Sequence, residues 1–298
     1  MKTVKILPLL LLAAALPAEA ALQVFACEPE WGALVTELAG DKADVYVATT
    51  ALQDPHQIQA RPSLLAKMRR ADLVVCTGAE LEIGWLPLIL RQAANPRVQP
   101  NQPGYFEAFH HVTMLEVPTV LDRSQGDVHP YGNPHLQADP RNIAKVAGPL
   151  ADKLAEVDRA NAATYAQRRA DFALRWDAAL RRWAERAAPL KGARVVGHHR
   201  SWPYLADWLG LQEVAFLEPK PSIPPSGAHL AALLEQLKGT PVRAIIRTAY
   251  EDERPSQWLA ERIHAPAVLV PHTVGATAQV TDLFTLYDAE IDALLGAR

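Results

Sequence analysis

Two histidines, His129 and His135, lie in a loop rich in glycine, proline and asparagine that occupies residues 126–140. The end of this loop predicts an abrupt helix start. Asp139 can accept hydrogen bonds from free backbone amides, and Pro140 suits the first helical turn because no N–H is needed there. The cap and the prolines restrict His135 just ahead of the helix. Such rigidity favours metal binding, since every side chain that binding immobilises costs affinity.

Three further histidines follow predicted strands. His56 lies in a loop after a strand ending at residue 48, His199 follows a strand ending at residue 197, and His272 follows one ending at residue 270. In open α/β sheets, ligands bind beyond the carboxyl ends of the strands. His56 and His135 come from the first half of the chain, and His199 and His272 come from the second. We therefore predict that these four histidines hold a metal in a cleft between two domains.

Short β-rich runs alternate with helical patterns along both halves of the chain. We expect strands at residues 22–27, 43–48, 72–76, 111–115, 193–197, 212–216, 242–246 and 267–270. Helical patterns lie between them, at residues 30–40, 63–69, 83–94, 205–210, 227–238 and 256–263. This alternation predicts an α/β fold with two domains, each with a mostly parallel four-stranded sheet flanked by helices.

A long helical region separates the two alternating halves. Apolar residues recur at three- and four-residue steps over residues 143–157, and a second stripe contains Tyr165, Phe172, Trp176, Leu180 and Trp183. About thirty helical residues would span roughly 45 Å, so we expect one backbone helix to join both domains. A coiled-coil dimer is the alternative, but the bulky stripe lacks sustained heptads, and we expect a monomer.

These patterns divide the chain into four segments. Residues 1–20 form a signal peptide, residues 21–157 an N-terminal α/β domain, residues 158–189 the linking helix and residues 190–298 a C-terminal α/β domain. The first segment has a short positive region, an apolar run too short to span a bilayer, and an Ala-Glu-Ala cleavage site. No cysteine directly follows that cleavage site. We therefore expect a periplasmic protein without a lipid anchor.

Charge and cysteine content narrow the partners and the chemistry. The net charge of −3 argues against nucleic acid or an anionic membrane as a partner. Cys27 and Cys76 each end a predicted buried strand. In an oxidising compartment they could form a disulfide; otherwise they are two small buried apolar residues.

Together these motifs resemble those of the periplasmic solute-binding proteins of zinc and manganese ABC importers, the high-affinity zinc uptake type, over essentially the whole mature chain. The Asp54-Pro55-His56 motif matches the family's motif after its second strand. An Ala-Asp-Leu-Val-Val run follows at residues 71–75, as it does in that family.

The remaining ligand motifs also resemble those of the family. Asn133-Pro134-His135 ahead of the helix start is similar to its Pro-His motif, and His199 precedes Tyr204 by five residues, as its next ligand does. That register selects His199 over His198. The family's fourth ligand is commonly an aspartate that opens a turn, and His272 stands in that place.

The resemblance implies a two-domain fold with a long backbone helix, and delivery of a metal ion to an ABC permease in the inner membrane. The sequence leaves open whether a periplasmic metallochaperone loads the site as a further partner. The ligand types indicate the metal separately, because neutral imidazoles suit Zn²⁺ and Mn²⁺ prefers carboxylate-rich sites. Three or four histidines favour Zn²⁺, with copper and nickel as alternatives.

Two other functions use similar residues. A periplasmic zinc-dependent hydrolase would keep one coordination position open for water and would need a general base. The chain has no His-Glu-x-x-His helix and no Gly-x-Ser-x-Gly elbow, so we expect no catalytic residues and no enzyme, although Glu28, Asp54 and Asp127 could lie near the site. A metal-dependent adhesin or metal buffer is the second alternative.

The fourth ligand and the loop ahead of His135 are the least determined features. Asp282 is the alternative to His272, although it precedes a helical pattern at residues 283–295 and could simply cap that helix. Residues 117–132 form a long connection, which predicts a mobile lid that carries His129 as an accessory metal ligand.

Overall fold

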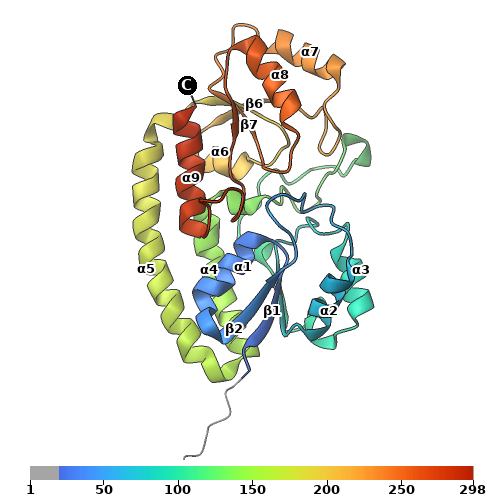
Figure 1. Ribbon diagram of the computed structural model, residues 1–298, viewed down its shortest axis with the longest axis vertical. Helices are drawn as coiled ribbons and strands as arrows, with labels where there is room; N and C mark the ends of the chain where they lie inside the picture. The colour runs from blue at the N-terminus through green and yellow to red at the C-terminus, as the bar shows by residue number, and fades with distance from the viewer. Residues whose placement is uncertain (1–19, 298) are drawn as a thin grey trace, which may run out of the picture.

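The computed structural model describes residues 20–297 of the chain. The predicted signal peptide, residues 1–20, therefore lies outside the described residues except for Ala20. Within the described range, the strands form two parallel four-stranded sheets with helices around them, which confirms the predicted α/β class (Figure 1). None of the helices in this range is long and apolar enough to cross a membrane.

The first sheet has the strand order β2-β1-β3-β4, and every pair in it is parallel. Its strands are β1 (Leu22–Ala26), β2 (Ala43–Val47), β3 (Leu73–Cys76) and β4 (Tyr105–Glu107). The connecting helices are α1 (Pro29–Ala39), α2 (Pro62–Arg70) and α3 (Leu86–Ala93), and each has a proline in its first turn. After β1 the chain forms β2 along one edge of β1 and then crosses over to form β3 along the other edge. The carboxyl ends of β1 and β3 therefore flank the topological switch point of this sheet.

The fourth strand lies earlier than predicted. Residues 111–115 were expected to form it, but β4 pairs Tyr105–Glu107 with the end of β3, and a short 3-10 turn follows at Ala108–His111. Within this turn the Phe109 amide donates a hydrogen bond to the Thr77 carbonyl, 3.0 Å away, but the register of the ladder between β3 and β4 does not continue past Glu107. The apolar residues of 112–115 pack against the core without pairing.

The second sheet repeats this arrangement with the order β6-β5-β7-β8. Its strands are β5 (Arg194–Gly197), β6 (Gln212–Phe216), β7 (Ala244–Arg247) and β8 (Ala267–Leu269). The helices α6 (Pro203–Leu209), α7 (Gly227–Gln236) and α8 (Glu253–Ile263) connect them. By the same rule, the carboxyl ends of β5 and β7 flank the second switch point.

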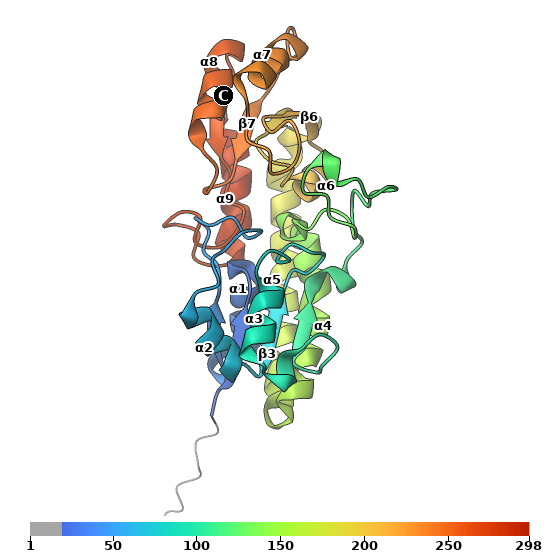
Figure 2. The ribbon, with the colours of Figure 1, turned by 90° about the vertical axis from the view of Figure 1, so that its right-hand side faces the viewer.

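Three helices hold the two sheets together (Figures 1 and 2). They are α4 (Pro140–Val157), α5 (Ala162–Ala187) and α9 (Leu283–Gly296). The 26 residues of α5 span about 39 Å, and this helix packs against α4, against α1 of the first half and against α9 of the second. The predicted aromatic stripe of α5 is buried, and one hydrophobic core contains residues from both sheets. The halves therefore share a core, which disfavours large motions between them.

Candidate metal centre

Three histidines from separate loops converge between the two halves. One ligand atom from each of His56, His135 and His199 lies within 4.8 Å of the others. The ring centroid of His56 lies 5.3 Å from that of His135 and 5.7 Å from that of His199, and the centroids of His135 and His199 are 5.4 Å apart. All three are buried, and in the described structure the Nε2 atoms of His56 and His135 have no hydrogen-bond partner. A tetrahedral Zn²⁺ holds its ligand nitrogens about 3.3 Å apart. A small inward movement of the rings would therefore complete three corners of such a site.

His56 is held by its own loop and by the segment beneath it. Asp54 Oδ1 accepts a hydrogen bond from the His56 amide at 3.0 Å and lies 2.7 Å from His56 Nδ1. Because an ionised carboxylate only accepts, the ring proton lies on Nδ1 and Nε2 is free to bind metal. Trp85 Nε1 donates to the Pro55 carbonyl at 2.9 Å. A Cβ at Gly84 would lie 2.6 Å from the His56 carbonyl oxygen, so only glycine permits this close approach.

His135 lies directly ahead of a short 3-10 turn and α4. The Asp139 side chain accepts a hydrogen bond from the Arg141 amide at 2.8 Å, which confirms the predicted helix start. Asn133 Oδ1 accepts from the His135 amide at 3.0 Å, and Asn133 Nδ2 donates to the Arg200 carbonyl at 2.8 Å. The loop that carries His135 is thereby tied to the residue that follows His199.

His199 follows β5 by two residues, next to the second switch point. Its Nδ1 lies 2.7 Å from Glu218 Oε2, so a carboxylate again orients the ring. The Tyr204 hydroxyl, five residues later, donates to the Asn133 carbonyl at 2.8 Å and accepts from the Leu115 amide at 3.0 Å. Sequence reasoning missed Glu218, although it follows β6 by two residues and the strand-end rule could have found it.

The protonation of these groups suits a divalent cation. Burial, reinforced by the neighbouring His56, holds the pKa of His135 well below its usual value. Burial alone would lower the pKa of His199, but the hydrogen bond and charge of Glu218 outweigh it and raise that pKa. Burial would raise the pKa of Asp54, but the hydrogen bond from His56 and its charge lower it. The site therefore combines a neutral imidazole at His135 with an ionised carboxylate, that of Asp54, behind His56.

His272 lies beside this cluster but is not part of the described group whose ligand atoms approach within 4.8 Å. Its buried ring packs against Tyr250 at 5.1 Å between centroids, and its Nδ1 has no partner in the described structure. Burial lowers the pKa of His272 to about 4, so the ring is neutral at physiological pH. Its role as a fourth ligand stays a prediction.

Asp282 begins α9. Its Oδ1 accepts a hydrogen bond from the Thr285 amide at 2.8 Å, and the Thr285 hydroxyl accepts one from the Asp282 amide at 3.0 Å. This reciprocal capping box gives the carboxylate the structural role that the helical pattern predicted.

The loop of residues 117–132 brings a second group of ligands to the centre. His129, Asp127 and His56 have ligand atoms within 4.8 Å of one another, and the rings of His129 and His56 are 5.3 Å apart. Burial lowers the pKa of His129 to about 4, so this ring is also neutral. His129 thus lies where an accessory ligand was predicted.

The same loop reaches the second half of the molecule. Lys220 Nζ donates to the Ser124 carbonyl at 2.5 Å, and the Asp127 amide donates to the Pro221 carbonyl at 3.2 Å. A cavity of about 410 Å³ between these segments is lined by His129 and His199, among others. The loop therefore covers one side of the metal centre, whereas its mobility stays a prediction.

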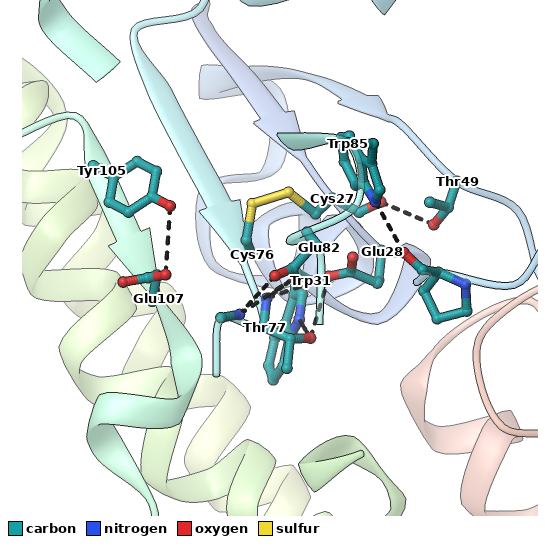
Figure 3. The surroundings of a disulfide bond; sticks show 12 residues. Cys27, Glu28, Trp31, Thr49, Cys76, Thr77, Glu82, Trp85, Tyr105 and Glu107 are labelled. Atoms are coloured by element: carbon teal, nitrogen blue, oxygen red, sulfur yellow. Dashed lines mark hydrogen bonds between the residues drawn. A yellow bond between two sulfur atoms is a disulfide. The ribbon is translucent and has the colours of Figure 1, made fainter. Parts of the chain in front are cut away.

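Cys27 and Cys76 form a disulfide that joins the carboxyl ends of β1 and β3, and both are fully buried (Figure 3). The segment that leaves Cys76 leads to Gly84 and Trp85, which support His56. The covalent bond thus anchors the start of a segment that underlies one of the candidate ligands.

Comparison with known proteins shows the family of this chain. A family model described as "Zinc-uptake complex component A periplasmic" matches residues 24–297. The chain is 26% identical over 250 residues to the zinc-binding lipoprotein AdcA of Streptococcus pneumoniae, which covers 83% of this chain and 48% of that protein. It is 25% identical over 300 residues to the high-affinity zinc uptake system protein ZnuA of Paracoccus denitrificans, and the match covers 89% of this chain and 88% of that protein.

A manganese protein and a solved structure are similar as well. The manganese ABC transporter substrate-binding lipoprotein PsaA of Streptococcus anginosus is 22% identical over 235 residues, 78% of this chain and 74% of that protein. A crystal structure of ZnuA aligns with a TM-score of 0.76 and 21% identity, covering 92% of this chain and 100% of that chain. The chain spans about half the length of AdcA, 48%.

The relatives form one class, proteins named for the binding or transport of zinc or manganese. Within that class, the chain belongs to the family of the periplasmic component A of the zinc-uptake complex. Members of this family are not enzymes, so the prediction of a non-enzyme is confirmed and the hydrolase alternative is wrong.

Proposed function

We propose that this protein captures Zn²⁺ in the periplasm with His56, His135 and His199 and delivers it to the permease of an ABC importer. The observation that carries this proposal is the convergence of three buried imidazoles, with one ring nitrogen of each within 4.8 Å of the others and the Nε2 atoms of His56 and His135 free of hydrogen bonds in the described structure. Zn²⁺ is the cargo of this site and not a resident cofactor. The zinc-uptake family to which the chain belongs supports the delivery step.

The donor set favours Zn²⁺ over Mn²⁺, although the chain resembles proteins named for each metal. Mn²⁺ prefers oxygen donors, whereas imidazole nitrogen suits Zn²⁺. The nearby carboxylates of Asp54 and Glu218 face the Nδ1 atoms of His56 and His199 and are engaged as hydrogen-bond acceptors. These carboxylates therefore orient the histidines, and the atoms left to bind the metal are mainly ring nitrogens.

His272 supplies the fourth ligand in this proposal, because its buried neutral ring has a free Nδ1 next to the cluster. His129 and Asp127 share His56 in a second group and serve as an accessory site on the path of the ion. An incoming Zn²⁺ would contact His129 and His56 first and would then pass to the three buried rings.

The test is competition of metal-free protein with a chromophoric zinc chelator. We expect one tightly bound Zn²⁺ and a much weaker response to Mn²⁺. Replacing His56, His135 or His199 with alanine should each lower zinc affinity by orders of magnitude without loss of fold. His110→Ala is the matched control, since His110 is 61% exposed and contacts Glu107 outside the centre.

The fourth ligand is tested in the same assay. His272→Ala should weaken zinc binding with little loss of stability, and Asp282→Ala should lower stability with little change in zinc binding. The reverse pattern would assign the ligand role to Asp282. Wild-type affinity in the alanine variants of all three clustered histidines would refute the proposed function.

A further inference from the structure

A second set of metal-ligating side chains lies at the switch point of the first sheet, where β1 and β3 end. Cys27 directly follows β1, Cys76 ends β3, and Glu82 lies on the segment that follows β3. The two Sγ atoms and one carboxylate oxygen of Glu82 lie within 4.8 Å of one another, and all three residues are buried. This is where an open α/β sheet places its ligand, but the histidine centre does not use these residues.

The carboxyl groups of Glu28 and Glu82 lie beneath the disulfide (Figure 3). Glu82 accepts hydrogen bonds from the Thr77 amide at 2.8 Å and the Gly78 amide at 3.2 Å. Glu28 Oε2 accepts from the Thr77 hydroxyl at 3.2 Å, whereas Glu28 Oε1 is buried without a partner in the described structure. Glu28 is 3% exposed and Glu82 is 3% exposed. A buried acceptor aimed into this cluster is available to a ligand.

Cations are missing from the surroundings of this pair. In the described part of the chain, the ion pairs within 4.0 Å include neither Glu28 nor Glu82. Burial, together with the charge of the other carboxyl group, raises the pKa of Glu28, and burial raises the pKa of Glu82 to about 7. A proton on this pair of carboxyl groups therefore stands where a cation would otherwise be needed.

We propose that Cys27, Cys76, Glu82 and Glu28 form a second metal site, closed by the disulfide and opened by its reduction, for a thiophilic divalent ion such as Zn²⁺ or Cd²⁺. A dithiol reductant breaks the S–S bond, becomes a disulfide itself, and leaves one proton on each cysteine sulfur. The metal ion then displaces both protons. Two thiolates balance its charge, and Glu82 and Glu28 supply carboxyl oxygens.

The local structure fits a tetrahedral ion of this kind. Zn²⁺ with bonds of about 2.3 Å to sulfur holds two thiolates about 3.8 Å apart, so the sulfurs need only separate once the bond is broken. The Thr77 and Gly78 amides already orient Glu82, and Trp31 Nε1 donates to the Thr77 hydroxyl at 2.8 Å. Such outer hydrogen bonds fix ligand orientation.

A cavity lies beside Glu82, on one side of the cluster. This cavity of about 290 Å³ is lined by Glu82, Ala79 and Tyr105, among others, and opens between α3 and the segment that follows β4. Reduction frees the segment after Cys76 at one end, so an ion can reach the sulfurs from the side of Glu82. The site shares no ligand with the histidine centre, and its metal binding is therefore independent of the proposed function.

The experiment titrates Cd²⁺ into the full mature protein in two forms: oxidised, and reduced with a dithiol that is removed before the metal is added under anaerobic conditions. We expect one equivalent bound by the oxidised protein and two by the reduced protein. The second equivalent should bring the ultraviolet charge-transfer absorption of cadmium thiolate. Circular dichroism of the reduced protein reports whether the fold is retained.

Variants separate this site from the histidine centre. His56→Ala should weaken the first equivalent and leave the thiolate signal, and a Cys27→Ser, Cys76→Ser double variant should show the reverse. Glu82→Gln keeps an acceptor for the Thr77 amide but loses the charge, and should weaken the second equivalent at least tenfold. Equal numbers of bound equivalents in the oxidised and reduced protein would overturn the proposal, whatever the histidine centre binds. Equal thiolate signals for the reduced wild type and Glu82→Gln would also overturn it, since thiols of an unfolded chain would bind without regard to Glu82.

Discussion

Glu218 orients His199, and replacing it with glutamine tests whether that contact serves metal binding. The Glu218 Oε2 atom lies 2.7 Å from His199 Nδ1, and both side chains are largely buried. Glutamine has nearly the same shape and keeps an acceptor oxygen, so the fold should persist. What is lost is the negative charge that strengthens the hydrogen bond and makes Nε2 a better donor to metal.

The size of the effect follows from that charge. A hydrogen bond to a charged group contributes about 1.5–3 kcal/mol, and about 1.4 kcal/mol corresponds to a tenfold change in an equilibrium constant. Zinc affinity of Glu218→Gln should therefore fall about 10- to 100-fold at pH 8, the range found when carboxylates behind metal-binding histidines are removed.

The pH dependence gives this prediction a second, independent signature. Glu218 raises the pKa of His199, so in the wild type a proton occupies this ring at a higher pH than in an ordinary histidine and competes with Zn²⁺. Affinity is lost as pH falls through that raised pKa. Without the charge, burial lowers the pKa of His199, and proton competition begins at lower pH. The ratio of wild-type to variant affinity should therefore shrink between pH 8 and pH 5.5.

Competition with a chromophoric chelator at several pH values measures both quantities. Glu213→Gln is the matched control, because Glu213 lies on β6 and its charged neighbours are Glu116 and Arg200. It should change zinc affinity little at any pH. Equal affinity of Glu218→Gln and wild type at pH 8, or a ratio that grows as pH falls, would refute the assigned role of Glu218.

Three further predictions concern the support of His56, the lid and a buried acid. Trp85→Phe removes the hydrogen bond to the Pro55 carbonyl and should lower both zinc affinity and stability. Trp183→Phe loses a hydrogen bond to Asp288, far from the centre, and should lower only the stability measured by denaturant unfolding. Deleting residues 123–129 should slow zinc binding in stopped flow more than it changes final affinity; unchanged rates would rule out the lid. Both carboxyl oxygens of Glu290 are buried without partners in the described structure, and burial raises the pKa of this group, so the protein loses stability as pH rises above 4.5. Glu290→Gln should raise the free energy of unfolding by up to about 3 kcal/mol at pH 7 and by little at pH 4.5. An equal gain at both pH values would contradict this reasoning.

Local patterns predicted most of the secondary structure. The strand runs and helical stripes required only side-chain periodicity, and the start of α4 followed from Asp139 and Pro140, which act on the backbone directly beside them. The exception, residues 111–115, shows the limit of this reasoning. That apolar run packs against the core, but the strand before it ends at Glu107 and a 3-10 turn follows.

The candidate ligands were found because topology constrains them. The carboxyl ends of parallel strands meet at one edge of a sheet, so the histidine after β2 had to lie near that edge of the first sheet, and those after β5 and β8 near that edge of the second. The same rule placed His56 and His199 at the centre but could not rank them against His272. The rule also puts Glu218, two residues after β6, at the edge of the second sheet, but it does not say whether the carboxylate faces a histidine or solvent.

The sequence by itself determined which elements form, the order in which they build two parallel sheets, and which histidines emerge at the strand ends. All of these depend on residues close together in the chain. Only the tertiary structure decided which rings meet, through contacts such as Tyr204 to Asn133 and Asn133 to Arg200, 71 and 67 residues apart. The physical reason is that a loop has no periodicity of its own. Its conformation, and the direction of the ligand it carries, is set by hydrogen bonds to segments that only folding brings into reach.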